Sequence, residues 1–236
     1  MAGGAVAKTS RLLREKVIQV GAHLLQCSPS EARCEGGAVH GPHGSVTIEE
    51  VARVAHLRME ALPEGVEPLL TVTSTYQPAI DTGVFTFAAH AAVVAVDVRT
   101  GAIEILDYAV AEDCGTVINP MIVEGQVHGG IAQGIGQALL EGAIYDSNGQ
   151  LVTGSLMDYS MPHAHDLPSF TIGLTETKSP SNPLGIKGCG EAGAIAAPAA
   201  VINAITDAIG TEELSMPATA QTVWSALKRG QPRQAA

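Results

Sequence analysis

A glycine-rich segment that contains a single carboxylate, residues 182–193, is the first part of the sequence where chemistry could occur. Its letters are NPLGIKGCGEAG, so Glu191 follows a glycine loop and begins an apolar, helix-forming run. A carboxylate placed in this way can act as a general base, and Gly188 and Gly190 would let a bound group come close to the backbone. The alternative interpretation is an ordinary glutamate in a first helical turn, which the helix dipole favours.

A second candidate segment, residues 112–141, reads EDCGTVINPMIVEGQVHGGIAQGIGQALLE. Asn119 followed by Pro120 predicts a helix N-cap and first turn, and the helix should run towards Glu141. Each glycine in a helix interior costs about 1 kcal/mol relative to alanine, so a helix with five of them needs a reason. Missing side chains permit close approach by another helix or by a bulky ligand, and close helix packing alone is the simpler explanation. The glycines are Gly125, Gly129, Gly130, Gly134 and Gly136, and the glutamines that could share one face are Gln126, Gln133 and Gln137.

Two other patterns are weaker. Gly188, Gly190 and Gly193 match G-x-G-x-x-G, but a dinucleotide fingerprint should follow a buried strand, whereas SPSNPLGIK precedes it here. A carboxylate inside that loop would also repel a pyrophosphate. His163 and His165, beside Asp166, could suggest a metal pair, but no further ligands stand at zinc-like spacing. We therefore expect neither a nicotinamide site nor a metal held by protein side chains.

Composition narrows the class of protein. The 13 basic and 24 acidic residues give a net charge of −11, which argues against nucleic acid as a partner. The four cysteines are too few and too scattered for a disulfide scaffold. Charged residues interrupt the N-terminus, so it does not resemble a signal peptide, and the apolar run 192–205 is too short to span a bilayer. We expect a soluble chain in a reducing compartment, the cytoplasm.

The elements that must position these segments alternate between helices and short strands. The apolar spacing predicts a helix over residues 8–26, short strands around the turn-rich stretch 36–44, and a helix from Ile48, capped by Thr47 and ended by Pro63. Strands are predicted over 69–76, 91–98, 102–110 and 170–175, and helical structure over 191–209 with a restart at Pro198. The predicted class is α+β, with mixed or antiparallel sheets and helices packed on one side. A division into a helix–hairpin–helix part, 1–65, and a site-bearing part, 66–236, is possible.

The two candidate segments together carry a resemblance to a known family. DCGTVINPMIVEGQVHGGIAQGIGQALLEG and SPSNPLGIKGCGEAGAIAAPAAVINAITDA resemble the molybdopterin-binding large subunit of the xanthine dehydrogenase/aldehyde oxidase family. The similarity looks closest to the bacterial large subunits that resemble carbon monoxide dehydrogenase, and it covers nearly the whole chain. The fold implied is the C-terminal half of a molybdenum-cofactor-binding domain.

The resemblance also implies a chemistry. In this family, molybdenum held by a dithiolene pterin, here expected in the cytosine dinucleotide form, oxidises an aldehyde, a heterocycle or carbon monoxide with oxygen derived from water. The protein supplies no ligand to the metal through its side chains. Glu191 would be the general base. The expected cofactor contacts are Asp113, Cys114, Gly115, Asn119, Gln126, Gly188, Cys189 and Gly190.

The sequence departs from the family in length. Large subunits of the family are much longer, and this chain resembles only their C-terminal portion. We therefore expect a truncated or split product that needs the missing N-terminal portion for activity, together with iron–sulfur and flavin subunits and a small-molecule substrate. The alternative function is a non-catalytic fragment that holds the cofactor or assists assembly.

Overall fold

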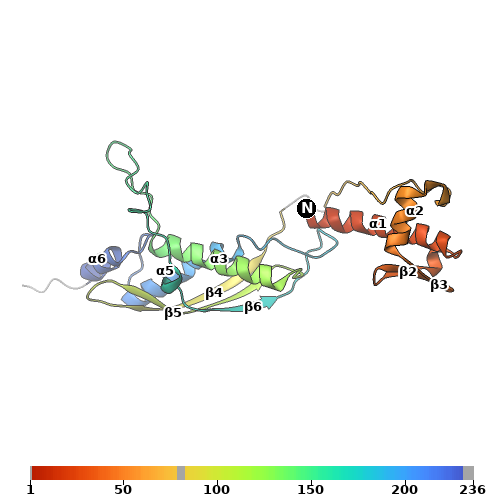
Figure 1. The fold of residues 1–236 in the computed structure, drawn as a ribbon. Helices are drawn as coiled ribbons and strands as arrows, with labels where there is room; N and C mark the ends of the chain where they lie inside the picture. The colour runs from red at the N-terminus through yellow and green to blue at the C-terminus, as the bar shows by residue number, and fades with distance from the viewer. Residues whose placement is uncertain (1, 79–82, 231–236) are drawn as a thin grey trace, which may run out of the picture. The chain divides into compact units, whose positions relative to one another are not determined.

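The computed structural model describes residues 2–78 and 83–230, and the chain divides into two compact units (Figure 1). The first unit comprises Met1–Asp81 and Pro180–Leu184, and the second comprises Thr82–Ser179 and Gly185–Ala236. The division therefore falls after residue 81 instead of residue 65, and a short piece of the later sequence belongs to the first unit.

The first unit packs two helices against a small antiparallel sheet. Its elements are α1 (Ala2–Leu24), the 3-10 turns η1 (Pro29–Glu31) and η2 (Met59–Ala61), β1 (Arg33–Glu35), β2 (Ala38–Gly41), β3 (Gly44–Thr47) and α2 (Ile48–Leu57). The strand order is β1-β2-β3. As predicted, Thr47 caps α2, because its hydroxyl accepts a hydrogen bond from the Glu50 amide at 3.2 Å. Buried valines from both helices and β2 form the core of this unit.

The prediction of a strand over residues 69–76 is wrong. This stretch runs without strand pairing, and several of its polar groups bond to helices α1 and α2. The Thr9 and Ser74 hydroxyls are 2.8 Å apart, and the Lys8 ammonium donates to the Thr75 carbonyl at 2.7 Å. The alternation of apolar and hydroxyl residues thus reflects a segment lying half-buried along a helix, a pattern that period alone cannot distinguish from a strand.

The second unit contains a mixed sheet with helices on one face (Figure 1). Strands β4 (Phe87–Val96) and β5 (Ile103–Asp113) are antiparallel, and β6 (Phe170–Thr175) lies parallel to β5. The helices are α3 (Pro120–Leu139), α4 (Ala192–Ile195), α5 (Ala197–Ile209) and α6 (Ala220–Gly230). One apolar core joins Tyr108 and Val110 of β5 to Ile131 of α3 and Val201 of α5. The α+β class and the mixed sheet are confirmed.

The helices of this unit begin where the sequence signals them, with one addition. The Asn119 side chain accepts from the Ile122 amide at 3.3 Å and caps α3, and α5 restarts with Pro198 in its first turn. Helix α6 was not predicted. The apolar run extends beyond the predicted residues 192–205. Residues Ala192–Ile209 reach the length and hydropathy of a membrane-crossing helix. The run is divided between α4 and α5, however, and α5 contributes Val201 and Ile205 to the core.

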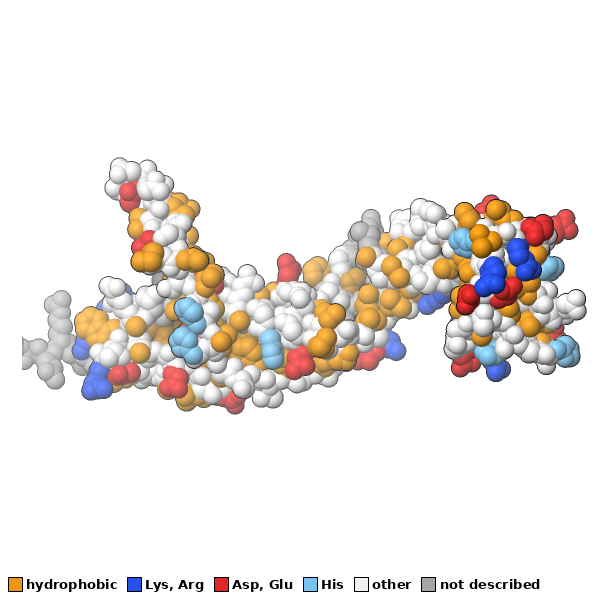
Figure 2. Space-filling model, viewed as in Figure 1, with side chains coloured by type: hydrophobic (Ala, Val, Ile, Leu, Met, Phe, Trp, Pro, Cys, Tyr) orange, Lys and Arg blue, Asp and Glu red, His pale blue; other side chains and the backbone are white. Residues whose placement is uncertain are grey.

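Residues 142–162 form an arm that stands out from the sheet and helices of the second unit (Figure 2). It contains a turn in which Asp146 accepts hydrogen bonds from the Asn148 and Gln150 amides. Large apolar side chains are exposed along it, with Leu156 at 76% and Met157 at 92% exposure. Such an exposed apolar surface is typical of a region that another protein surface covers. The 3-10 turn η3 (Ala164–Asp166) follows the arm and leads to β6.

Candidate active site

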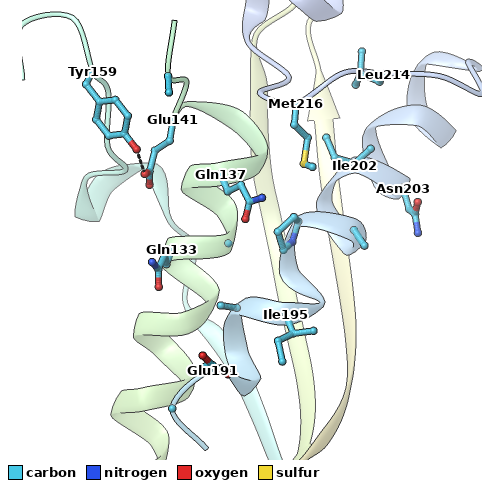
Figure 3. Close-up of a pocket in the computed structure, with 16 residues that line it drawn as sticks. Gln133, Gln137, Glu141, Tyr159, Glu191, Ile195, Ile202, Asn203, Leu214 and Met216 are labelled. Carbon is cyan, nitrogen blue, oxygen red and sulfur yellow. Dashed lines mark hydrogen bonds between the residues drawn. The ribbon is translucent and has the colours of Figure 1, made fainter. Parts of the chain in front are cut away.

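A pocket of about 1170 Å³ lies between α3, α4 and α5 of the second unit (Figure 3). Gln133 and Gln137 reach it from α3, and Glu191 reaches it from the residue just before α4. Its farther end is lined by Ile202 and Met216. Glu141 and Asn203 also line it, so the pocket combines three amides and two carboxylates with apolar walls, a composition typical of sites for small molecules or cofactors.

The five glycines of α3 differ in what surrounds them. A Cβ placed on Gly136 would overlap the Glu141 carboxylate and lie 2.9 Å from Pro162 Cδ. A Cβ placed on Gly130 would lie 2.9 Å from the Ala194 amide nitrogen, and one on Gly134 would lie 2.6 Å from the Ala197 Cβ. These two glycines, on the side of α3 that faces α4 and α5, are explained by close helix packing. At Gly125 and Gly129, by contrast, an added Cβ would meet nothing within 4 Å. Packing within the chain leaves these two glycines unexplained, and they make one flank of α3 bare of side chains.

The bare flank lies beside the glutamines. Gln126, Gln133 and Gln137 are seven and four residues apart, which places them along one side of a helix, and all three are exposed. The Gly188–Gly190 loop passes close to the first of them, since a Cβ placed on Gly190 would lie 3.6 Å from Gln126 Oε1. Gln126 and the glycine loop are therefore neighbours in this fold.

Glu191 occupies the junction between the loop and α4. Its backbone is already helical, with φ −104° and ψ −12°, and its side chain makes no capping hydrogen bond. The residue is exposed, and it forms no ion pair within residues 2–78 and 83–230. The carboxylate is therefore available to a group bound in the pocket, as a general base requires.

Backbone pairing fixes the start of the glycine loop against the end of β5. The Lys187 amide donates to the Cys114 carbonyl at 2.8 Å, and the Thr116 amide donates to the Gly185 carbonyl at 3.1 Å. Gly115 has φ +68°, and any Cβ there would overlap the Gly185 carbonyl oxygen. Only glycine allows this crossing.

A buried ion pair lies next to the place where the glycine loop meets the end of β5. Lys187 Nζ is 2.8 Å from Asp113 Oδ1, with only 6% and 2% of the two side chains exposed. The carboxylate also accepts from the Gly115 amide at 3.0 Å and the Thr175 hydroxyl at 3.3 Å. Burial alone would raise the pKa of Asp113, but the Lys187 ammonium and hydrogen bonds from Gly115 and Thr177 outweigh it and hold that pKa well below its ordinary value.

Glu112, the neighbour of Asp113, is in the opposite situation. It is fully buried, its Oε1 accepts from the Thr86 hydroxyl at 2.6 Å, and its Oε2 has no partner among the described residues. Burial raises the pKa of this carboxyl, although the Thr86 hydrogen bond and the Lys187 charge act against the shift. A buried acid with an unpartnered oxygen is costly when it ionises.

The raised pKa of Glu112 gives a prediction about stability. A carboxyl whose pKa is raised by folding contributes stability that is fully present below its ordinary pKa and lost as the pH rises through its folded-state pKa. We therefore expect Glu112→Gln to gain stability over the wild type as the pH rises from about 5 to about 8, because glutamine does not ionise. Urea unfolding at several pH values measures this, with Glu104→Gln at an exposed position of β5 as the control. Parallel curves for Glu112→Gln and the wild type would contradict it.

The remaining predicted site residues differ in accessibility. Asn119, Gln126, Gly188 and Gly190 are exposed, and Cys189 is half-buried against the core. Asp113 and Cys114 are buried, and burial also raises the pKa of the Cys114 thiol. Within this chain Asp113 and Gly115 contact the glycine loop, and contact of these residues with a cofactor stays a prediction.

Sequence reasoning missed Lys187 and the pair formed by Glu141 and Tyr159. The Tyr159 hydroxyl donates to the Glu141 carboxylate at the rim of the pocket (Figure 3). The sequence does contain a signal for Lys187, because it is the one cationic residue in the glycine-rich segment 182–193 of an acidic chain. For Tyr159 there was none, since it lies in the arm, eighteen residues from Glu141.

The two histidines both pair with Asp166. One Asp166 carboxylate oxygen is 3.4 Å from His163 Nδ1 and the other is 3.2 Å from His165 Nε2, and the two rings stack with their centroids 5.5 Å apart. Across the part of the chain that the structure describes, no three His, Cys, Asp or Glu residues gather in a group able to hold a metal ion.

Comparison with known proteins shows the family to which this fold belongs. Residues 1–168 match the molybdopterin cofactor-binding domain family, and the chain belongs to it.

Relatives come from enzymes of one kind. The chain is 37% identical over 234 residues to the nicotine 6-hydroxylase large subunit of Paenarthrobacter nicotinovorans, and 32% identical over 231 residues to the carbon monoxide dehydrogenase large chain of Hydrogenophaga pseudoflava. These alignments cover 97% of this chain but only 28% of each relative. Among solved structures, quinoline 2-oxidoreductase from Pseudomonas putida 86 matches with a TM-score of 0.85 and 41% identity, over 96% of this chain and 29% of that one.

The residues present fit a molybdopterin group. The bare flank at Gly125 and Gly129 leaves space against the α3 backbone, and Gln126 offers both a donor and an acceptor beside it. The loop glycines add a second bare surface, since a Cβ on Gly188 would meet nothing within 4 Å. A planar, polar cofactor needs such a combination of backbone access and amide groups.

Proposed function

We propose that this chain forms part of the active site of a molybdenum hydroxylase large subunit, in which Glu191 is the general base. The observation that carries the proposal is the placement of the unpaired Glu191 carboxylate in a pocket of about 1170 Å³ that Gln133 and Gln137 also line. The reaction is the oxidation of a small molecule with oxygen derived from water.

The chain's own residues have distinct parts in this reaction. When bound, the molybdenum–pterin group accepts the two electrons that the substrate loses. Gln126, Gln133 and Gln137 donate and accept hydrogen bonds along the cofactor's edge, and the bare flank lets it lie against α3. Glu191 takes the proton from the attacking water, so that the oxygen becomes a better nucleophile.

The substrate class follows from the relatives. Nicotine 6-hydroxylase and quinoline 2-oxidoreductase are named for nitrogen heterocycles, and the carbon monoxide dehydrogenases are named for a one-carbon substrate. We infer that this chain serves a heterocycle, an aldehyde or carbon monoxide, with the cofactor in its cytosine dinucleotide form.

Partners are part of the proposal. Apolar side chains are exposed along the arm and at the start of α3, where Met121 has 76% of its surface exposed. Exposed apolar surface of this kind is typical of a region that another protein surface covers. We propose that the rest of a large subunit provides it, and that iron–sulfur and flavin subunits carry the electrons away. One relative is itself named as the gamma subunit of a dehydrogenase complex.

The bare flank gives a test that does not depend on turnover. Gly129→Ala should stabilise the chain by about 1 kcal/mol, because alanine is the better helix former and its methyl group meets no other atom. The same methyl group should obstruct the cofactor, so molybdenum and pterin content after co-expression with the complementary part of the subunit should fall severalfold.

The control for this test is Glu124→Ala, at an exposed position on another side of α3. It should leave cofactor content unchanged. If Gly129→Ala retains the full molybdenum and pterin content, the cofactor does not lie against this flank. If the wild type binds cofactor but shows no turnover with its partners present, the chain serves to hold the cofactor or to assist assembly.

A further inference from the structure

The Gly188–Glu191 segment is held between two anchors. Upstream, Gly185 and Lys187 fix the loop, because the Gly185 carbonyl accepts from the Thr116 amide and the Lys187 amide donates to the Cys114 carbonyl. Downstream, Gly193 lies against the α3 backbone, where an added Cβ would be 3.1 Å from the Ile131 amide nitrogen. Between them, no atom crowds Gly188, and only the amide of Gln126 comes near Gly190. The position of Glu191 therefore depends on how firmly these two ends are held.

The upstream anchor is more than backbone pairing. The Lys187 side chain is almost fully buried, with its ammonium 2.8 Å from the Asp113 carboxylate and 3.8 Å from the centre of the Phe87 ring. Asp113 is in turn bound to Gly115 and Thr175. The ammonium thus joins the loop to the ends of β4 and β5, and through Thr175 to the end of β6.

A buried ion pair is well suited to fixing the register of a flexible loop. Apolar side chains tolerate small displacements, but a shift of the loop by one residue would leave both buried charges without a partner, which is strongly unfavourable. The two glycines after Lys187 have unusual backbone freedom, so the loop needs such a constraint. Salt bridges used in this way contribute specificity of arrangement more than stability.

We propose that Lys187 is a positioning residue for the reaction: its buried ion pair with Asp113 fixes the glycine loop in the register that places Glu191 in the pocket. The part of this proposal that concerns Glu191 rests on the proposed function. The part that concerns the loop stands on the geometry alone.

The test compares local opening of the loop with turnover. In the 236-residue chain, Lys187→Met keeps the length of the side chain and removes its charge. Amide hydrogen exchange at position 187 and at Thr116 should become at least tenfold faster relative to exchange at Ile131, in the middle of α3. In the assembled enzyme, kcat should fall at least tenfold while KM and molybdenum content stay near their wild-type values.

Conservative and control variants separate positioning from general destabilisation. Lys187→Arg keeps the charge and should restore most of the protection and of kcat. Val223→Ala, in the core of α6 and away from the loop, should lower overall stability and leave kcat and the relative exchange at position 187 unchanged. If Lys187→Met does not fold, the isosteric Asp113→Asn, which also removes the ion pair, should show the same two effects.

The outcomes distinguish the two proposals. The positioning role is overturned if Lys187→Met accelerates amide exchange at position 187 no more than at Ile131. It is also overturned if Lys187→Arg does not recover kcat. If Glu191→Gln keeps wild-type turnover, the proposed function fails, whereas the exchange measurement still decides whether the ion pair holds the loop.

Discussion

Replacing Glu191 by glutamine should lower turnover in the assembled molybdenum enzyme by about 100- to 10,000-fold, the range that a positioned general base contributes. Glutamine has nearly the same shape and keeps hydrogen-bonding capacity, but it cannot accept the proton. Because the carboxylate makes no cap and no ion pair with the described residues, its loss should leave folding and cofactor content near normal. The measurement is kcat together with molybdenum and pterin analysis of the same preparation.

A matched control lies at the opposite end of the pocket. Glu141 lines the same cavity but is bound by the Tyr159 hydroxyl, so Glu141→Gln should change turnover far less than Glu191→Gln. If the two substitutions have equal effects, the pocket is sensitive to its charge in general, and Glu191 has no special place in proton transfer.

Substituting Gly193 by alanine should destabilise the second unit by about 3 kcal/mol, the upper part of the range for overpacking. The added methyl group would overlap the Val127 carbonyl oxygen and lie 3.2 Å from Gly130 Cα, and neither neighbour is a side chain that can rotate away. Helices α3 and α4 would have to move apart. Urea unfolding, followed by circular dichroism, measures the loss.

The adjacent glycines of α3 provide an internal comparison. Gly130→Ala should also destabilise, because its methyl group would meet the α4 backbone, whereas Gly129→Ala should stabilise. The same substitution at neighbouring positions thus has opposite signs. Unchanged unfolding midpoints for Gly193→Ala and Gly130→Ala would show that the helices do not cross at this distance.

Local signals predicted much of the second unit. The Asn119-Pro120 cap, the turn before β5 and the alternation of Phe170–Thr175 are properties of a few adjacent residues, and each element forms where its signal lies. Helix α6 was not predicted, although its apolar positions include Val223 and Ala226, which are both buried. The strand predicted over 69–76 failed because an alternating pattern records burial on one side and does not specify what covers that side.

The sequence predicts which residue types form the candidate site, but it does not predict which of them pack internally and which face open space. The sequence identifies Glu191, the glutamines and the glycines as unusual, and it raises both packing and ligand approach as reasons. Only the structure separates Gly130, which packs, from Gly129, which faces open space. The pairing of Asp113 with Lys187, 74 residues later, has no local signature, so the sequence alone does not predict it.

The assignment of Pro180–Leu184 to the first unit has an evolutionary consequence. Its sequence neighbours on both sides, Ser179 and Gly185, belong to the second unit, so the chain passes between the units three times. Inside the first unit the stretch is bonded at least once, by the Tyr76 hydroxyl to the Ser181 carbonyl at 3.4 Å. Recombination between related genes therefore could not exchange the first unit as one continuous stretch of coding sequence. The two separate stretches that encode this unit would have to be inherited together.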